Sequence, residues 1–304
     1  MSDHRGDPRP RRRPLWIIFL AAVASAPVVV GIPAVPVGAS NPSYVALGDS
    51  YASGPFIPDQ QTNPSGCLRS DHNYAHLVAQ AIGLNLTDVS CTGATTADLT
   101  GPQSTTSGTN PAQLNAVSKS TAVVTLSIGG DDLGFTSVIE NCVALTPWGP
   151  TKSGLTCKSL YDPNGVDRLA AAIAATKPRI AAALQKIHTQ APNAKVFVVG
   201  YPDILPSTGD GCWPRMPFTH TDAPYLENTE VELNAMLSTV SASNGATYID
   251  TYIPSEGFNA CTAGSVRWIE PIVPTTLAAP VHPNVSGEAG MARIIEPVLT
   301  THGA

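Results

Sequence analysis

Short apolar runs alternate with longer segments of helical periodicity along most of this chain, and this alternation limits the folds that it can adopt. The runs have the length of buried strands and lie at 44–47, 84–89, 122–128, 195–199 and 246–249. The helical segments lie at 71–82, 165–188, 222–240 and 286–299, with a break expected in the second of them near Pro178. This order favours a three-layer α/β/α sandwich around a mostly parallel sheet, in which functional residues gather at the carboxyl ends of the strands.

The 304-residue chain is long enough for one sizeable core, and it has no internal repeat or long linker after residue 40. We therefore expect a single domain over residues 40–304. Residues 1–39 have the pattern of a signal peptide, because the arginines at 11–13 precede an apolar stretch at 15–31 and a small-residue cleavage site at 37–39. The alternative is an uncleaved membrane anchor. The prolines in this segment favour cleavage, and hence a secreted protein.

Charge narrows the range of partners. Cleavage after Ala39 removes five arginines and two aspartates, which leaves 12 basic and 21 acidic residues and a net charge of −9. No basic stripe remains, so the sequence argues against a nucleic-acid partner and against electrostatic binding to anionic lipid. We expect a monomer that does not insert stably into a membrane after cleavage.

All six cysteines lie in the part of the chain that follows the predicted signal peptide. An even number in this position predicts disulfides, for which fifteen pairings are formally possible. We favour pairs of sequence neighbours, because each pair then closes one long loop region: Cys67–Cys91, Cys142–Cys157 and Cys212–Cys261. The cysteines have no C-x-x-C spacing, so we predict no metal site.

The first apolar run ends abruptly in Gly48-Asp49-Ser50, which predicts that a buried strand delivers a serine onto a tight turn. A serine hydroxyl is a weak nucleophile until a base removes its proton. His282 is the candidate base, although 231 residues separate it from the serine and only the fold could bring the two together. Taken singly, each would be a helix-capping residue.

Four blocks in this chain resemble those of the SGNH (GDSL) hydrolases, in the form of secreted actinobacterial lipases and esterases. They lie at 48–51, 90–94, 128–132 and 281–284, and the resemblance extends over about residues 43–300. It implies an SGNH-hydrolase, flavodoxin-like fold and the cleavage of carboxylic esters without a cofactor. Ser50 would attack the ester to form an acyl-enzyme, and His282 would act first as base and then as acid.

The resemblance also assigns an oxyanion hole to the backbone N–H groups of Ser50 and Gly93, although Gly93 alone could be an ordinary turn residue. The third donor of the family is an asparagine, and here Asp131 stands in its place. An ionised carboxylate only accepts hydrogen bonds, so Asp131 would donate only if burial kept it protonated. We expect reduced activity that is better in acid.

A second departure concerns the residue that orients the histidine. The family aspartate three positions before the histidine is replaced by Ala279. We expect a main-chain carbonyl, that of Ala279 or a neighbour, to accept from the histidine Nδ1–H. Glu270, the nearest upstream acid, is the alternative.

The favoured hypothesis is thus a secreted lipase or esterase that acts on a small ester or lipid substrate. The alternative is a weakly active or non-catalytic protein on the same fold that binds a lipid or glycan, and Asp131 is the residue in its favour. Phospholipase and deacetylase activities are variants of the first hypothesis.

Overall fold

The computed structural model describes residues 41–64, 66–145, 156–209 and 211–304, and the predicted signal peptide at 1–39 lies outside these ranges. Residues Ser40–Ala304 form one compact unit. Its central sheet is parallel and has the strand order β2-β1-β5-β6-β7. These strands are β1 (Ser43–Gly48), β2 (Asn85–Asp88), β5 (Val123–Ser127), β6 (Lys195–Val199) and β7 (Thr247–Ile249). Each matches one of the five apolar runs, so the predicted α/β fold with a mostly parallel sheet is confirmed.

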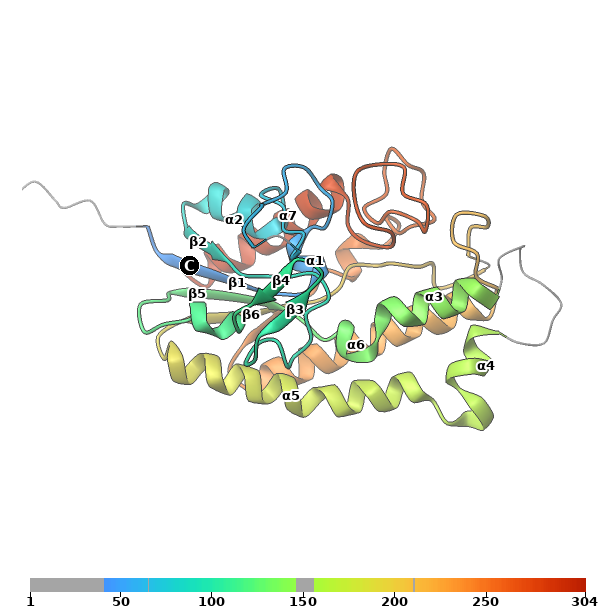
Figure 1. Cartoon of the computed structure of the whole chain (residues 1–304), viewed down its shortest axis with the longest axis horizontal. Helices are drawn as coiled ribbons and strands as arrows, with labels where there is room; N and C mark the ends of the chain where they lie inside the picture. The colour runs from blue at the N-terminus through green and yellow to red at the C-terminus, as the bar shows by residue number, and fades with distance from the viewer. Residues whose placement is uncertain (1–40, 65, 146–155, 210) are drawn as a thin grey trace, which may run out of the picture. The chain divides into compact units, whose positions relative to one another are not determined.

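Helices cover both faces of the sheet (Figure 1). One face carries α2 (Tyr74–Ile82) and α7 (Val285–Thr301), and the other carries α5 (Arg168–Gln190) and α6 (Asp222–Ser243). Side chains of β1 alternate between the two cores: Val45 and Leu47 face α5 and α6, whereas Tyr44 and Ala46 face α2 and α7. Burial on both faces explains why this strand is apolar throughout.

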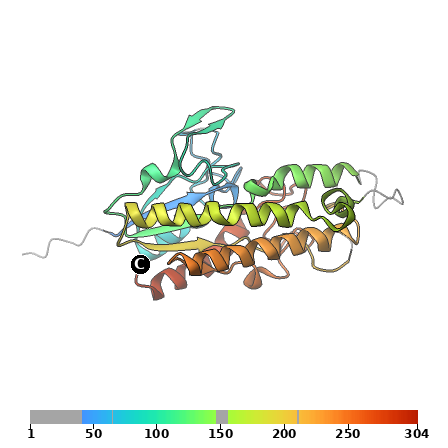
Figure 2. The ribbon, with the colours of Figure 1, turned by 90° about the horizontal axis from the view of Figure 1, so that it is seen from below.

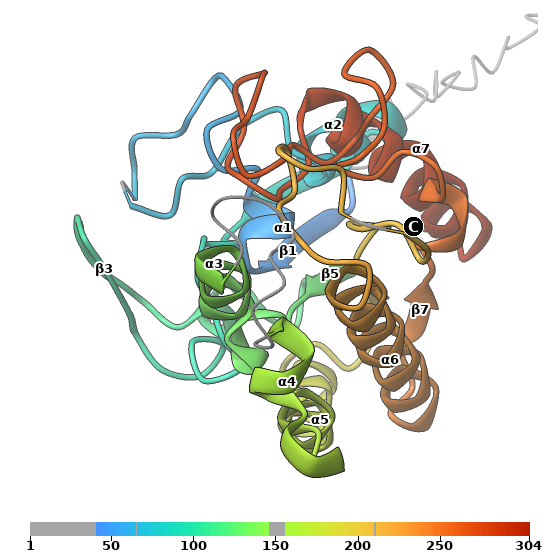
Figure 3. The same cartoon turned by 90° about the vertical axis from the view of Figure 1, so that its right-hand side faces the viewer.

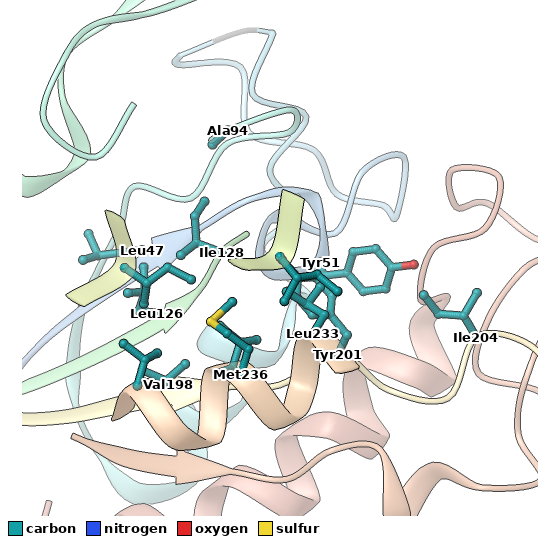
Figure 4. Close-up of a cluster of buried hydrophobic side chains, with 14 of the residues drawn as sticks. Leu47, Tyr51, Ala94, Leu126, Ile128, Val198, Tyr201, Ile204, Leu233 and Met236 are labelled. Atoms are coloured by element: carbon teal, nitrogen blue, oxygen red, sulfur yellow. The ribbon is translucent and has the colours of Figure 1, made fainter. Parts of the chain in front are cut away.

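One row of side chains shows how the sheet and α6 form a common core. Leu47, Leu126 and Val198 are register partners on β1, β5 and β6, and all three are fully buried. Met236 of α6 belongs to the same cluster (Figure 4). This packing fixes the strand ends from which the site residues emerge.

Helices α5 and α6 run side by side (Figure 2). Helix α5 continues through Pro178, where we expected a break, and that prediction is wrong. The proline is exposed and removes one backbone hydrogen bond. Buried side chains continue at helical spacing on both sides of it, from Ile173 to Ile180 and Leu184. Tertiary packing therefore outweighs the local cost of the proline.

The remaining elements are short. Three helices, α1 (Ser50–Ser53), α3 (Phe135–Leu145) and α4 (Cys157–Tyr161), accompany an antiparallel pair, β3 (Gln103–Thr105) and β4 (Gly108–Asn110). Single 3₁₀ turns are η1 (Gln113–Ala116), η2 (Asp131–Leu133), η3 (Pro163–Gly165) and η4 (Ile253–Ser255). In the described part of the chain, no helix is long and apolar enough to cross a membrane.

Three disulfides connect the loop regions, and their pairs are the ones favoured from the sequence order. Cys67–Cys91 joins the loop after α1 to the loop after β2, and Cys142–Cys157 joins α3 to α4. Cys212–Cys261 joins the loop before α6 to the loop after β7.

Two glycines allow α7 to approach the segment that contains Trp268 very closely. A Cβ atom on Gly290 would lie 2.3 Å from Cζ2 of Trp268, and one on Gly287 would lie 2.5 Å from the Trp268 carbonyl oxygen. The same carbonyl accepts from the Asn284 N–H at 2.8 Å. Because Asn284 follows His282 by two residues, this contact positions the histidine loop against the C-terminal helix.

We expect Gly290→Ala to destabilise the protein, although alanine is the better helix former by about 1 kcal/mol. The new methyl group must displace the buried Trp268 ring, and overpacking of this kind costs about 1–3 kcal/mol. Thermal unfolding measures the difference. The control is Ser286→Ala on the exposed first turn of α7, which should change stability by less than about 0.5 kcal/mol. Equal melting temperatures for all three proteins would contradict the close-approach argument.

Candidate active site

Ser50 and His282 meet at the carboxyl end of the sheet. Ser50 is the first residue of α1, directly after β1, and Asp49 caps this short helix by accepting from the Tyr51 N–H at 2.9 Å. The Ser50 Oγ atom lies 2.7 Å from Nε2 of His282. The fold thus brings together the two residues that the sequence singled out, across a separation of 232 positions.

The other ring nitrogen of His282 fixes the tautomer. Nδ1 lies 2.7 Å from the carbonyl oxygen of Pro280. Because a carbonyl can only accept, Nδ1 carries the proton, and Nε2 is left to accept from the serine hydroxyl. Burial lowers the pKa of His282 to about 4, although the bond to the carbonyl acts in the opposite direction. The ring is therefore a neutral base at pH 7.

The accepting carbonyl lies one residue later than that of Ala279, which we named from the sequence. Ala279 faces a different neighbour, since its N–H donates to the Pro55 carbonyl at 3.0 Å. Val281 has a φ of 60°, and this left-handed turn carries the Pro280 carbonyl onto the histidine ring. The expectation of a main-chain acceptor agrees with the structure, and the assignment to Ala279 is corrected to Pro280.

Glu270, the alternative partner for the histidine, has other bonds. Its fully buried carboxylate accepts from Arg267 at 3.0 Å and from the Asn284 side chain at 2.8 Å. Burial alone would raise its pKa, but these bonds and those from the threonines at 275 and 276 outweigh burial and lower the pKa to about 2. Its backbone N–H donates to the His282 carbonyl at 2.9 Å. Glu270 thus supports the loop and not the ring.

Two backbone N–H groups are free to bind an oxyanion. In the residues that the structure describes, neither the Ser50 N–H nor the Gly93 N–H donates to another protein group. Gly93 has a φ of 73°, which a side chain would strain. Its loop is held beside the end of β1, because the Cys91 N–H donates to the Gly48 carbonyl at 3.0 Å.

Asp131 stands at the edge of the same site. It begins the η2 turn that follows β5, and it lines one pocket together with Ser50. Burial, followed by the charges of Asp132 and Asp98, raises the pKa of Asp131 to about 6. Asp132 accepts from the Thr96 N–H at 2.8 Å and from its hydroxyl at 2.5 Å, and so joins this turn to the Gly93 loop.

The pocket beside Ser50 has apolar walls. Its cavity volume is about 50 Å³, and it is partly open to solvent. Side chains from η2, α3, α5, α6 and the loop after β6 line it, including Leu133, Val138, Leu169, Leu205, Leu226 and Leu233. Figure 3 shows the arrangement of the helices α3, α5 and α6. Among the described residues, no three His, Cys, Asp or Glu side chains gather as a metal ion would require.

Comparison with known proteins decides the family. Residues 46–289 match the GDSL-like lipase/acylhydrolase family. The chain belongs to this family. It is 39% identical over 258 residues to Lipase 2 of Streptomyces coelicolor, which covers 84% of this chain and 85% of that protein.

Solved structures agree with the fold of this GDSL-family hydrolase. A phospholipase A1 from Streptomyces albidoflavus superposes with a TM-score of 0.67 at 27% identity, over 86% of this chain and 99% of that one. An extracellular lipase from Streptomyces rimosus superposes with a TM-score of 0.68 at 24% identity, over the same shares. The protein is a carboxylic ester hydrolase, as the sequence predicted.

Two tyrosines of this GDSL-family hydrolase were missed at the sequence level. Tyr201 follows β6, and its hydroxyl accepts from the Gly130 N–H at 2.8 Å and donates to Asp49. Burial raises the pKa of Asp49 well above its usual range, and the nearby Asp131 adds to this. Tyr51 packs against both Tyr201 and the ring of His282. In the sequence, the one feature that could have indicated a role for Tyr201 is its position at the carboxyl end of a predicted strand.

Proposed function

We propose that this hydrolase is a secreted serine esterase or lipase that works through an acyl-enzyme on Ser50. The observation that carries the proposal is the 2.7 Å contact between Ser50 Oγ and His282 Nε2, with the Nδ1 proton held by the Pro280 carbonyl. Three disulfides and the likeness to a lipase described as extracellular support secretion. The enzyme acts as a monomer on a small ester or lipid, without a cofactor or a nucleic-acid partner.

The reaction follows from the geometry. His282 removes the Ser50 proton through Nε2 as Oγ attacks the ester carbonyl, and the N–H groups of Ser50 and Gly93 stabilise the resulting oxyanion. The imidazolium then returns the proton to the leaving alcohol, which breaks the C–O bond and leaves the acyl group on Ser50. Water, activated by the same histidine, hydrolyses the acyl-enzyme and regenerates the serine.

Asp131 adds a third donor only while its carboxyl group is protonated. Its pKa of about 6 places this state in weak acid, whereas His282, with a pKa of about 4, is a neutral base above that value. The rate therefore rises as the pH passes the histidine pKa, and it falls as the pH passes the aspartate pKa. Activity is highest between about pH 4 and pH 6.

The apolar pocket binds the acyl chain of the substrate. Leucine, valine and isoleucine side chains form much of its wall, and Ser50 is among the residues that line it. Each methylene group of the acyl chain that is buried in the pocket stabilises binding by about 0.8 kcal/mol. The enzyme therefore prefers acyl groups long enough to fill the pocket.

The proposal is tested first with Ser50→Ala. Hydrolysis of p-nitrophenyl esters should fall by about 10³-fold or more, since the nucleophile is lost. Ser53→Ala is the matched control, because this buried serine lies in the same helix and its hydroxyl has no partner among the described residues. Similar rates for wild type and Ser50→Ala would refute the acyl-enzyme.

Asp131→Asn should raise activity at neutral pH. At pH 7.5 only a few per cent of Asp131 is protonated, so a permanent amide donor is expected to increase kcat about thirtyfold. At pH 5 the two proteins should differ by less than about twofold, and both should lose activity near pH 4 as His282 is protonated. A pH–rate profile of each protein measures this. A variant whose activity still falls above pH 6 would show that Asp131 is no donor.

Val138→Trp should shorten the acyl preference. Val138 lines the pocket from α3, and an indole there fills the space that a long chain needs. We expect kcat/KM to fall about tenfold or more for p-nitrophenyl decanoate and to change less than about twofold for the acetate. Val166→Trp, at a side chain that is 66% exposed, is the control. Equal losses on both esters would place the acyl chain elsewhere.

A further inference from the structure

Tyr51 directly follows the nucleophile, yet its side chain belongs to the histidine loop. The residue is buried, and its hydroxyl donates to the Val281 carbonyl at 2.6 Å. Its ring lies 4.9 Å from the ring of His282, with an angle of 33° between the planes. Tyr201 packs edge-on against it at 5.1 Å. Figure 4 shows Tyr51 and Tyr201 close together beside Leu233.

Val281 has a conformation that its own side chain disfavours. A β-branched residue with a φ of 60° is an outlier that persists only where the surroundings hold it. Two hydrogen bonds do so: the Val281 N–H donates to the Glu270 carbonyl at 2.9 Å, and the Val281 carbonyl accepts from Tyr51. The valine side chain is itself buried. Tyr51 is thus one of the two groups that hold the backbone of this residue.

The orientation of His282 depends on this turn. The carbonyl that accepts from Nδ1 belongs to Pro280, the residue immediately before Val281. If the Val281 backbone relaxed toward the extended region, the peptide planes on both sides would rotate and the Pro280 carbonyl would leave Nδ1. The imidazole would then lose both its fixed tautomer and its fixed plane.

We propose that Tyr51 is a positioning residue that takes the place of an orienting carboxylate. Its hydroxyl holds the strained turn that presents the Pro280 carbonyl, and its ring covers one face of the imidazole. This inference rests on the proposed roles of Ser50 and His282. Burial raises the pKa of Tyr51 well above its usual range, which keeps the hydroxyl a donor.

Tyr51→Phe tests the hydroxyl alone, because the ring remains. We expect kcat for p-nitrophenyl acetate to fall about tenfold and KM to change less than about twofold, since the tyrosine acts through the base. Tyr44→Phe is the matched control. Tyr44 is also a buried tyrosine with one hydroxyl bond, to Thr125 at 2.8 Å, and it faces the core on the side of α2 and α7. Its kcat should equal that of the wild type.

A spectroscopic readout reports on the histidine itself. In protein labelled with ¹⁵N-histidine, the Nδ1–H proton of His282 should give a downfield NMR signal that is absent in His282→Ala. The signal should be sharp in the wild type and in Tyr44→Phe, and broadened or lost in Tyr51→Phe.

Val281→Gly provides a rescue. Glycine adopts a φ of 60° without steric strain, so the hydrogen bond from the Tyr51 hydroxyl becomes less important for holding this turn. In the Val281→Gly background, Tyr51→Phe should lower kcat by less than about threefold, and the Nδ1–H signal should persist. The double-mutant cycle isolates this coupling from effects common to both backgrounds.

Three results would overturn the proposal: an unchanged kcat and Nδ1–H signal in Tyr51→Phe, an equal loss in Tyr44→Phe, or an equal loss in the two Val281 backgrounds. None of these results would contradict the proposed function, which is refuted only if Ser50→Ala retains wild-type activity.

Discussion

The hydrogen bond from His282 Nδ1 to the Pro280 carbonyl is the constraint on which the active site depends. It fixes the tautomer in which Nε2 accepts from Ser50, and among the residues that the structure describes no carboxylate bonds to this ring. A carbonyl dipole stabilises an imidazolium less than a full charge does, and the lowered pKa of His282 reflects a site that favours the neutral ring. In a Ser-His-Asp triad, the charged aspartate orients the histidine and stabilises its imidazolium form. Here the histidine is oriented by the geometry of the loop, without a charge beside the ring.

Carboxyl groups crowd the other side of the site. Asp49, Asp131 and Asp132 all follow strand ends. Burial raises the pKa of Asp49 and of Asp131; the charge of Asp131 adds to the shift at Asp49, and the charges of Asp132 and Asp98 add to the shift at Asp131. Like charges in one buried site favour retention of a proton by the pair. Tyr201 accommodates this arrangement, since its hydroxyl donates to Asp49 while it accepts from the Gly130 N–H. The local charge near the proposed oxyanion hole consequently depends on pH.

The sequence predicted what arises from local pattern. The five strands follow from apolar runs, and their parallel order places Ser50 and the Gly93 and Asp131 loops at one edge of the sheet. The continuity of α5 through Pro178 depends on buried neighbours, which a local rule for proline does not include. The bond from Tyr51 to Val281 spans 230 positions, and no pattern along the chain reveals it. The shift from Ala279 to Pro280 depends on one φ angle.

Glu270 shows how this protein uses a carboxylate at a distance from the reaction. Its low pKa keeps it ionised, and its charge is matched by Arg267 and by the amide of Asn284. The backbone of Glu270 pairs with that of Val281 and His282, so the ion pair also holds the segment that contains the histidine. A buried ion pair is costly to break, because one unpaired charge then remains. Glu270 thus affects the imidazole indirectly, because it stabilises the loop that holds the histidine. The loop then keeps the Pro280 carbonyl in place beside the ring.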